Sequence, residues 1–373
     1  MKIAYVTIHI EPKIVNGGVG SKIKSQISIW RSMGHAVTLF MLTPEPVSSM
    51  PDASQFVFRP PRKSLPGVKF VLREIARSTA LAKLISQVRQ YQPDIIYFRF
   101  GLFTIPLQRL FEIAPVVLEV NSNDLDEYRS RGPFFYWLNR LTRKLLFSRC
   151  AGWIASSFEL ANLPVNRGYG RPVCVISNGI ELSKYQPLAP PQNQFPVLAL
   201  VGSPGMSWHG VDKLLPLAKR YPDLQIHIIG YRREDLQGTI PENVHLYGYL
   251  DYENVKKVLA GVDVVFGTLA LYRKKMEEAS PLKIREALAY GIPVILAYHD
   301  TDLADIDSDL FLFLPNTKTS ILDHAQAIHD FAFRVRGMRV KREIVSERIS
   351  QQHKEATRLK FFNEVLDSAG GRA

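Results

Sequence analysis

Short runs of apolar, mostly β-branched residues alternate along the chain with longer segments whose apolar residues recur at the helical period. The runs are almost continuously apolar, which is typical of parallel strands buried on both faces. Strands that alternate with helices indicate right-handed βαβ units and doubly wound α/β sheets. The predicted strands span residues 3–8, 36–41, 94–98, 116–120, 153–155, 173–176, 197–201, 225–229, 244–247, 262–266, 293–297 and 310–314.

One stretch without an apolar period interrupts this pattern half-way along the chain. Residues 187–196 are rich in proline and polar side chains, as interdomain linkers are. A chain of 373 residues is long enough for two domains. We therefore predict a first domain at residues 1–186 and a second at 197–351. A charged helix from about residue 352 to 373 is expected to pack back on the first domain.

Composition and charge narrow the classes of partner. The chain is 46% hydrophobic and 22% charged, as ordinary globular proteins are. The net charge of +12 suits nucleic acid, anionic lipid and phosphorylated substrates alike. Because the sequence has neither zinc-finger spacing nor an RNA-recognition aromatic motif, we expect no nucleic acid partner.

The cysteines and the N-terminus indicate the compartment. Cys150 and Cys174 are isolated and lie beside apolar runs, as small core residues of a reducing compartment do. The N-terminal residues read as a first strand and not as a signal peptide, and no apolar run is long enough to cross a bilayer. We therefore expect a cytoplasmic protein.

Residues 278–295 carry the strongest chemical signal. Ser280 is a good N-cap residue and is followed by a proline at the expected first helical position, and Gly291 suits the left-handed position past the helix end. The N–H groups of Leu282 and Lys283 would then be free at the positive end of a helix. Together with the Lys283 ammonium they predict a phosphate site.

Two carboxylates accompany this phosphate site. Glu278 precedes the predicted helix and Glu286 lies within it. A carboxylate beside bound phosphate is electrostatically costly unless it accepts hydrogen bonds, for example from sugar hydroxyls. Taken alone, the segment is equally well explained as a surface helix with two solvated glutamates.

Two further segments place ligand-binding groups after predicted strands. Gly17, Gly18 and Gly20 follow the first strand, where they would let backbone N–H groups approach a phosphate or sugar. Their spacing is not that of the dinucleotide fingerprint, and a loop that needs positive φ explains them as well. Residues 202–213 follow the strand at 197–201, at the edge where doubly wound sheets bind ligands.

Polar residues also end strands of the first domain. Arg99 ends one predicted strand, and Asn121 and Asp124 follow the next. We expect these three side chains at one edge of the sheet, on the side where the acceptor of a transferred group would bind. Asp124 is a candidate general base or ligand of an acceptor hydroxyl, although an Asx-type turn explains it equally well.

In this order, and over nearly the whole chain, these segments resemble the retaining GT-B glycosyltransferases of the group 1 family (glycosyltransferase family 4). Residues 278–295 resemble the E-x7-E motif followed by G-x-P-V, which is the most specific match. Residues 17–20 resemble the glycine loop of the family, and residues 201–212 resemble the opening of its second domain.

The resemblance implies the GT-B fold, with two Rossmann-like domains that face a central cleft. It implies transfer of a sugar from a nucleotide-diphosphate sugar to a glycan or lipid-linked saccharide with retention of anomeric configuration, as in cell-surface polysaccharide biosynthesis. The nucleotide-sugar is a co-substrate, and neither a cofactor nor a metal is implied. We interpret the D-x-D sequences at 300–302 and 307–309 as chance turns.

The resemblance also implies roles. Glu278 would contact the donor sugar near its reacting carbon, and Glu286 would contact the ribose hydroxyls. Leu282 and Lys283 would hold the diphosphate. Gly18 and Gly20 would close over the donor.

Three residues depart from the family pattern. Ser203 and His209 stand where the family usually has an arginine and a lysine, and Asn121 stands where it often has a histidine. The missing cations leave open a non-catalytic binding subunit of the same fold. A nucleotide-sugar epimerase or a sugar phosphorylase is a further alternative.

Residues 133–149 are aromatic, apolar and basic at once. They predict either an interfacial helix on anionic lipid, or an amphipathic helix docked on the first sheet with its basic face in water. The first alternative would place the protein on the inner face of the membrane.

Overall fold

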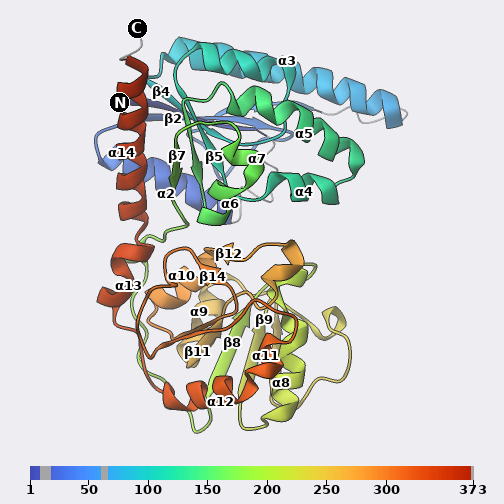
Figure 1. Cartoon of the computed structure of the whole chain (residues 1–373), viewed down its shortest axis with the longest axis vertical. Coiled ribbons are helices and arrows are strands. Elements are labelled where there is room, and N and C mark those ends of the chain that lie inside the picture. Colours follow the sequence, from blue (N-terminus) through green and yellow to red (C-terminus); the bar gives the residue numbers. More distant parts are fainter. Residues whose placement is uncertain (9–17, 60–65, 371–373) are drawn as a thin grey trace. The chain divides into compact units, whose positions relative to one another are not determined.

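The computed structural model describes residues 1–8, 18–59 and 66–370, and it divides the chain into two compact units. The first unit comprises Met1–Ile176 and Lys354–Ala373, and the second comprises Ser177–His353. Each has a parallel sheet with helices on both faces (Figure 1). The boundary falls before the predicted linker, because the chain beyond Ile176 already pairs with the second unit through Ile180 and Ser350.

The sheet of the first unit has seven strands in the order β3-β2-β1-β4-β5-β6-β7. Every pair in it is parallel, so the strands' carboxyl ends lie at one edge. The strands are β1 Lys2–Ile8, β2 Ala36–Thr43, β3 Ser54–Val57, β4 Ile95–Arg99, β5 Val116–Val120, β6 Gly152–Ala155 and β7 Val173–Val175.

Helices from both ends of the chain cover one face of this sheet. Trp30 on α2 is fully buried against Tyr97 of β4 and Phe362 of α14, with ring centroids 5.4 and 5.6 Å away. Its Nε1 donates a 2.7 Å hydrogen bond to Glu355, whose carboxylate also accepts one from Arg358. Helix α3 packs on β2 and β3. The helices are α2 Gly18–Ser32, α3 Pro66–Tyr91, η1 Ile105–Glu112, α4 Asp124–Ser130, α5 Pro133–Phe147, α6 Phe158–Asn162, α7 Pro164–Arg167 and α14 Gln351–Gly370.

The second unit repeats the strand order of the doubly wound fold. Its parallel sheet runs β10-β9-β8-β11-β13-β15, and a separate pair is formed by β12 and β14. The strands are β8 Val197–Val201, β9 Gln225–Ile229, β10 Val244–Gly248, β11 Val264–Phe266, β12 Glu278–Ala279, β13 Val294–Leu296, β14 His299–Asp300 and β15 Phe311–Phe313.

Two apolar cores lie on the two faces of this sheet. Leu198, Leu200 and Ile226 point to the face covered by α8, α11 and α12, whereas Val197 and Ala199 point to the face covered by α9, α10 and α13. None of the helices described is long and apolar enough to span a membrane. The helices are η2 Leu182–Lys184, η3 Ser207–His209, η4 Val211–Lys213, α8 Leu214–Arg220, η5 Arg233–Asp235, α9 Tyr252–Ala260, η6 Leu271–Lys274, α10 Leu282–Ala289, α11 Ser320–Asp323, α12 Ala325–Arg334 and α13 Arg342–Ile349.

Candidate functional site

Helix α10 begins one residue later than predicted. Pro281 is its N-cap, with extended φ and ψ of −66° and 133°, so the prediction that Ser280 caps the helix was wrong. The Ser280 hydroxyl instead accepts a hydrogen bond from the backbone N–H of Asn178 at 3.1 Å. Gly291 has a φ of +81°, which confirms the left-handed position after the helix.

The first turn of α10 presents unpaired backbone donors. Its first intrahelical hydrogen bond runs from the Ile284 N–H to the Pro281 carbonyl. Within the described part of the chain, neither the Leu282 nor the Lys283 N–H donates a hydrogen bond. These two N–H groups are therefore available at the positive end of the helix, and their binding to a phosphate stays a prediction.

The Lys283 side chain reaches from this turn to the end of β8. Its Nζ donates a 2.8 Å hydrogen bond to the Val201 carbonyl. Burial lowers the pKa of Lys283 to about 8. At neutral pH the ammonium is thus still mostly charged, and it is already held beside the loop that follows β8.

His209 occupies this loop as a neutral side chain. Its Nδ1 lies 3.2 Å from the backbone N–H of Ser203, which can only donate, so Nδ1 accepts and the proton resides on Nε2. Burial, followed by the nearby charge of Lys283, lowers the pKa of His209 to about 4. The missing family cation is therefore replaced here by a neutral N–H donor.

Tyr231, which the sequence analysis missed, holds this arrangement together. Its hydroxyl donates a 2.7 Å hydrogen bond to the Ser203 carbonyl and lies 3.2 Å from His209 Nδ1. A Cβ on Gly202 would lie 2.7 Å from the Tyr231 ring and 2.8 Å from the His209 Nδ1, so any larger residue would displace these side chains. The turn at Gly230, with φ of +96° directly after β9, is a signal that could have found Tyr231.

Glu286 lies one helix turn beyond the free N–H groups, on the same side of α10. The Tyr185 hydroxyl donates a 3.3 Å hydrogen bond to its Oε1. Burial raises the pKa of the Glu286 carboxyl, and the hydrogen bond from Tyr185 opposes that rise. No local sequence pattern pairs Tyr185 with Glu286, because the contact joins distant parts of the chain.

Glu278 is 5% exposed and lies in β12, which pairs with β14. The next helix is anchored by Arg285, whose buried guanidinium contacts Asp300 at 2.5 and 2.7 Å and Asp302 at 2.6 Å. Asp300 and Asp302 therefore have a structural role that the interpretation as chance turns did not include. They are the counter-ions that fix α10 beside β14.

The predicted acceptor-side residues Arg99 and Asn121 share one polar cluster in the first unit. Arg99 contacts Glu119 at 3.1 Å, and Lys22 contacts Glu119 at 3.0 Å and the Asn121 side-chain oxygen at 2.9 Å. Burial would raise the pKa of Glu119, but Lys22 and Arg99 outweigh it and hold that pKa well below its ordinary value. Glu119 and Lys22 were missed, although a carboxylate inside an apolar strand was a visible signal.

Asp124 is engaged differently from the prediction. The Arg143 guanidinium contacts both of its carboxylate oxygens, at 2.7 and 3.1 Å, and the Asn139 amide donates a 2.5 Å hydrogen bond. The carboxylate is buried and joins α4 to α5. Both carboxylate oxygens are already engaged by protein donors, so this geometry argues against the predicted catalytic role.

The glycine segment is only partly described. Gly17 lies outside the described residues, whereas Gly18 and Gly20 form the first turn of α2 and not a loop. Glycines at the start of a helix leave backbone N–H groups open to a close ligand, so the predicted contact stays a prediction.

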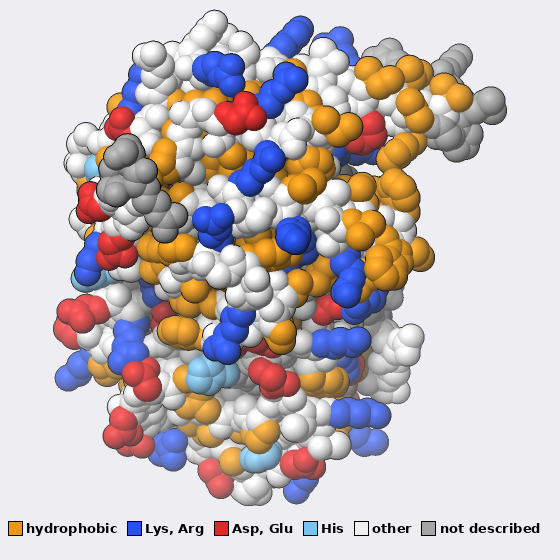
Figure 2. All heavy atoms as spheres, turned by 45° about the horizontal axis from the view of Figure 1, so that its top comes forward, with side chains coloured by type: hydrophobic (Ala, Val, Ile, Leu, Met, Phe, Trp, Pro, Cys, Tyr) orange, Lys and Arg blue, Asp and Glu red, His pale blue; other side chains and the backbone are white. Residues whose placement is uncertain are grey.

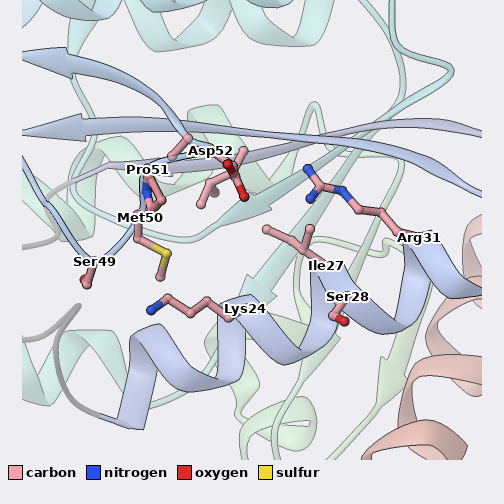
Figure 3. A pocket seen from close by; sticks show the side chains of 10 residues that line it. Lys24, Ile27, Ser28, Arg31, Ser49, Met50, Pro51 and Asp52 are labelled. Carbon is pink, nitrogen blue, oxygen red and sulfur yellow. The ribbon is translucent and has the colours of Figure 1, made fainter.

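A cavity of the first unit lies away from the predicted site residues. A cavity of about 450 Å³ lies between α2 and residues 49–53, lined among others by Lys24, Arg31 and Asp52 (Figure 3). None of the predicted site residues lines it. Among the described residues, no group of three or more His, Cys, Asp or Glu side chains is arranged to hold a metal ion.

Two family models match the chain in sequence. Residues 16–184 match Glycosyltransferase Family 4, and residues 196–330 match Glycosyl transferases group 1. The chain belongs to the group 1 glycosyltransferases. The predicted enzyme class, a glycosyltransferase, is thereby confirmed. No curated protein sequence matches the chain.

Solved structures match this glycosyltransferase over almost its whole length. Sucrose-phosphate synthase from Thermosynechococcus elongatus matches with a TM-score of 0.73 and 13% identity, over 98% of this chain and all of that one. The lipopolysaccharide outer core galactosyltransferase WaaB matches with a TM-score of 0.66 and 16% identity, over 99% of this chain and 100% of that one. The Anabaena protein HepE, in complex with UDP and glucose, matches with a TM-score of 0.62 and 15% identity, over 98% of this chain and 100% of that one. At such identities the likeness concerns the fold, and it confirms the GT-B fold.

Proposed function

We propose that this glycosyltransferase takes its sugar from a nucleoside-diphosphate sugar and transfers it with retention of configuration. The observation that carries the proposal is the start of α10, where two free N–H groups and the Lys283 side chain meet the His209 loop. These groups come from separate segments, and each supplies a donor or a positive charge. Such a set suits the diphosphate of the donor.

The same groups favour departure of the nucleoside diphosphate. As the bond between the sugar carbon and the phosphate oxygen breaks, negative charge grows on the diphosphate. The N–H groups of Leu282 and Lys283, the Lys283 ammonium and the Nε2–H of His209 would stabilise that charge. Because these groups are positioned beforehand, they pay no reorganisation cost during the reaction.

Glu286 and Glu278 would orient the donor. Glu286, held by Tyr185, would accept hydrogen bonds from the ribose hydroxyls, and the buried Glu278 would accept them from the sugar. Hydrogen bonds to a charged carboxylate contribute about 1.5–3 kcal/mol each. Ser203 and the helical Gly18 and Gly20 complete the proposed donor contacts.

Retention requires that the acceptor oxygen attack the face from which the diphosphate leaves. The acceptor hydroxyl would form its bond to the anomeric carbon while its proton passes to an oxygen of the leaving phosphate. The products are the glycosylated acceptor and the nucleoside diphosphate. This route needs no side-chain base, which agrees with the engagement of Asp124 by Arg143.

The acceptor is proposed to be a glycan or a lipid-linked saccharide of cell-surface polysaccharide synthesis, met by Arg99 and Asn121 of the first unit. The two free cysteines suit a reducing compartment, so we place the protein in the cytoplasm. We expect neither a cofactor nor a metal requirement. Nucleic acid is not proposed as a partner.

The test is turnover of a panel of nucleoside-diphosphate sugars, followed by NMR of the first anomer released by hydrolysis or transfer. We expect one donor to be consumed with its configuration retained, in the presence of a chelator, and Glu278→Gln to reduce the rate at least about a hundredfold. Inversion would refute the stereochemistry. An epimerised donor formed without acceptor would favour the epimerase alternative.

The neutral His209 favours one alternative, a binding subunit without catalysis. A site with one cation in place of three would hold the donor diphosphate but stabilise its departure less. Tight nucleotide-sugar binding without turnover of any donor in the panel would support that alternative.

A further inference from the structure

Helix α5 exposes one stripe of large apolar side chains to solvent. Phe134, Trp137, Leu141 and Leu145 recur at helical spacing and are 57, 54, 71 and 38% exposed. The opposite face is docked and contains the buried Asn139 and Arg143 as well as Leu146 and Phe147. Helix α5 is thus docked on the first unit with Arg140 and Lys144 in water, as one of the two alternatives predicted, but its exposed face also contains this apolar stripe.

A second helix extends the apolar surface. Near its start, α3 exposes Val68, Phe70, Val71, Leu72 and Ile75, each by 40% or more. Phe70 and Phe134 are in edge-to-face contact, with ring centroids 5.6 Å apart, so the two stripes are continuous. We call this surface the α3–α5 patch. Figure 2 shows hydrophobic side chains gathered there, at its right edge.

Basic side chains predominate on the two helices of the patch. Helix α5 contains no Asp or Glu, and Glu74, the one acidic residue of α3, is paired with Arg77 at 3.0 Å. Arg140 and Lys144 are exposed beside the stripe, and the Arg140 guanidinium lies over the Trp137 ring at 5.7 Å. Arg73 and Arg131 are exposed near the junction of the two helices.

We propose that the α3–α5 patch docks the first unit on an anionic lipid surface. Apolar and aromatic side chains with a rim of Lys and Arg match the acyl boundary and the negative headgroups of such a surface. Monomeric proteins seldom expose contiguous apolar patches without an interaction that uses them. A second copy of the chain is a poorer occupant, because two basic rims would then meet.

The proposal does not depend on the proposed sugar transfer. It gives the acceptor-side unit a place on a membrane, where a lipid-linked saccharide would be presented. Membrane docking without transfer, and transfer without membrane docking, are distinguishable results.

The test is flotation of the full-length protein with vesicles of phosphatidylcholine alone or with about a third phosphatidylglycerol, at low and high salt. We expect binding to the anionic vesicles that weakens as salt screens the rim. Leu141→Glu should lower the partition coefficient at least about tenfold, and Trp137→Glu with Leu141→Glu should abolish binding. Arg140→Gln with Lys144→Gln should remove most of the preference for anionic vesicles.

Leu322→Glu is the matched control, because Leu322 is 43% exposed on α11 of the second unit. It should leave binding unchanged, and all variants should keep the wild-type melting temperature. No wild-type binding at low salt would overturn the proposal, as would equal binding by the wild type and Leu141→Glu. Vesicle-independent dimerisation that Leu141→Glu abolishes would assign the patch to a second copy instead.

Discussion

At the scale of single residues, Lys283 connects the geometry of the site to a pH dependence. Burial lowers its pKa to about 8, and a bound diphosphate favours the charged form. The ammonium is lost as pH rises through about 8, so nucleoside-diphosphate binding should weaken by up to about tenfold per pH unit above that value. Isothermal titration between pH 6.5 and 9.5 measures this.

Lys283→Arg is the control for that titration, because arginine stays charged over the whole range. Its pH profile should be flat where that of the wild type falls. Identical profiles would show that another group is responsible for the titration.

Substitution of Asp124 distinguishes a structural role of its carboxylate from a catalytic one. Asp124→Asn leaves the buried Arg143 without its counter-ion, which should cost about 3–5 kcal/mol of unfolding free energy. With no role as base, kcat should change only a few-fold when measured on folded protein. A loss of kcat of about a hundredfold or more, with stability unchanged, would restore Asp124 as a catalytic group.

Local signals predicted the residues that depend on local structure. The start of α10 and the left-handed Gly291 follow from capping and turn chemistry, and the structure moves both the cap and the first helical residue one position later than predicted. Tyr185 and Tyr231 could not be predicted in the same way. Each acts through a hydrogen bond to a segment that is distant in sequence, which only the fold brings close.

At the scale of elements, every predicted strand is present, since a continuously apolar run bounded by turns leaves few alternatives. The strands that were missed are β3, which is half-buried and short, and the two-residue β12 and β14. These short strands depend on a neighbour and not on their own pattern. The orientation of α5 likewise depends on its neighbours. Its stripe of apolar residues predicts an amphipathic helix but not which face is docked.

The Arg285 cluster holds α10 in place and offers a test at this scale. Asp300→Ala would leave the buried Arg285 with a weakened set of counter-ions, and we expect it to cost about 3–5 kcal/mol in urea denaturation. Asp305→Ala breaks the exposed pair with Arg348 and should cost less than about 1 kcal/mol. Equal effects of the two substitutions would contradict the assigned role of the cluster.

At the scale of the whole molecule, the two halves of the chain build sheets of related strand order, and the last helix returns to the first unit. The alternating pattern and the linker composition predicted the two α/β units. The position of the boundary could not be predicted, because it depends on the pairing of Ile180 with Ser350.

The returning helix should stabilise the first unit strongly. Phe362 is fully buried against Trp30 and Tyr97, so Phe362→Ala should cost about 3–5 kcal/mol. Tryptophan fluorescence during urea unfolding reports this, since Trp30 lies in the contact. Ile105→Ala is the control, because Ile105 is 76% exposed in the same unit, and it should change stability by less than about 0.5 kcal/mol.

The central claim is that the start of α10 binds the diphosphate of a nucleotide-sugar. Its most direct test is isothermal titration of the purified protein with UDP, GDP, ADP and dTDP, for the wild type, Lys283→Ala, Glu286→Gln and the exposed control Glu347→Gln. The account predicts that one nucleotide binds the wild type and the control equally, and that each site variant weakens binding about ten- to a hundredfold. Binding unaffected by both site variants, or no binding of any nucleotide at millimolar concentration, would contradict it.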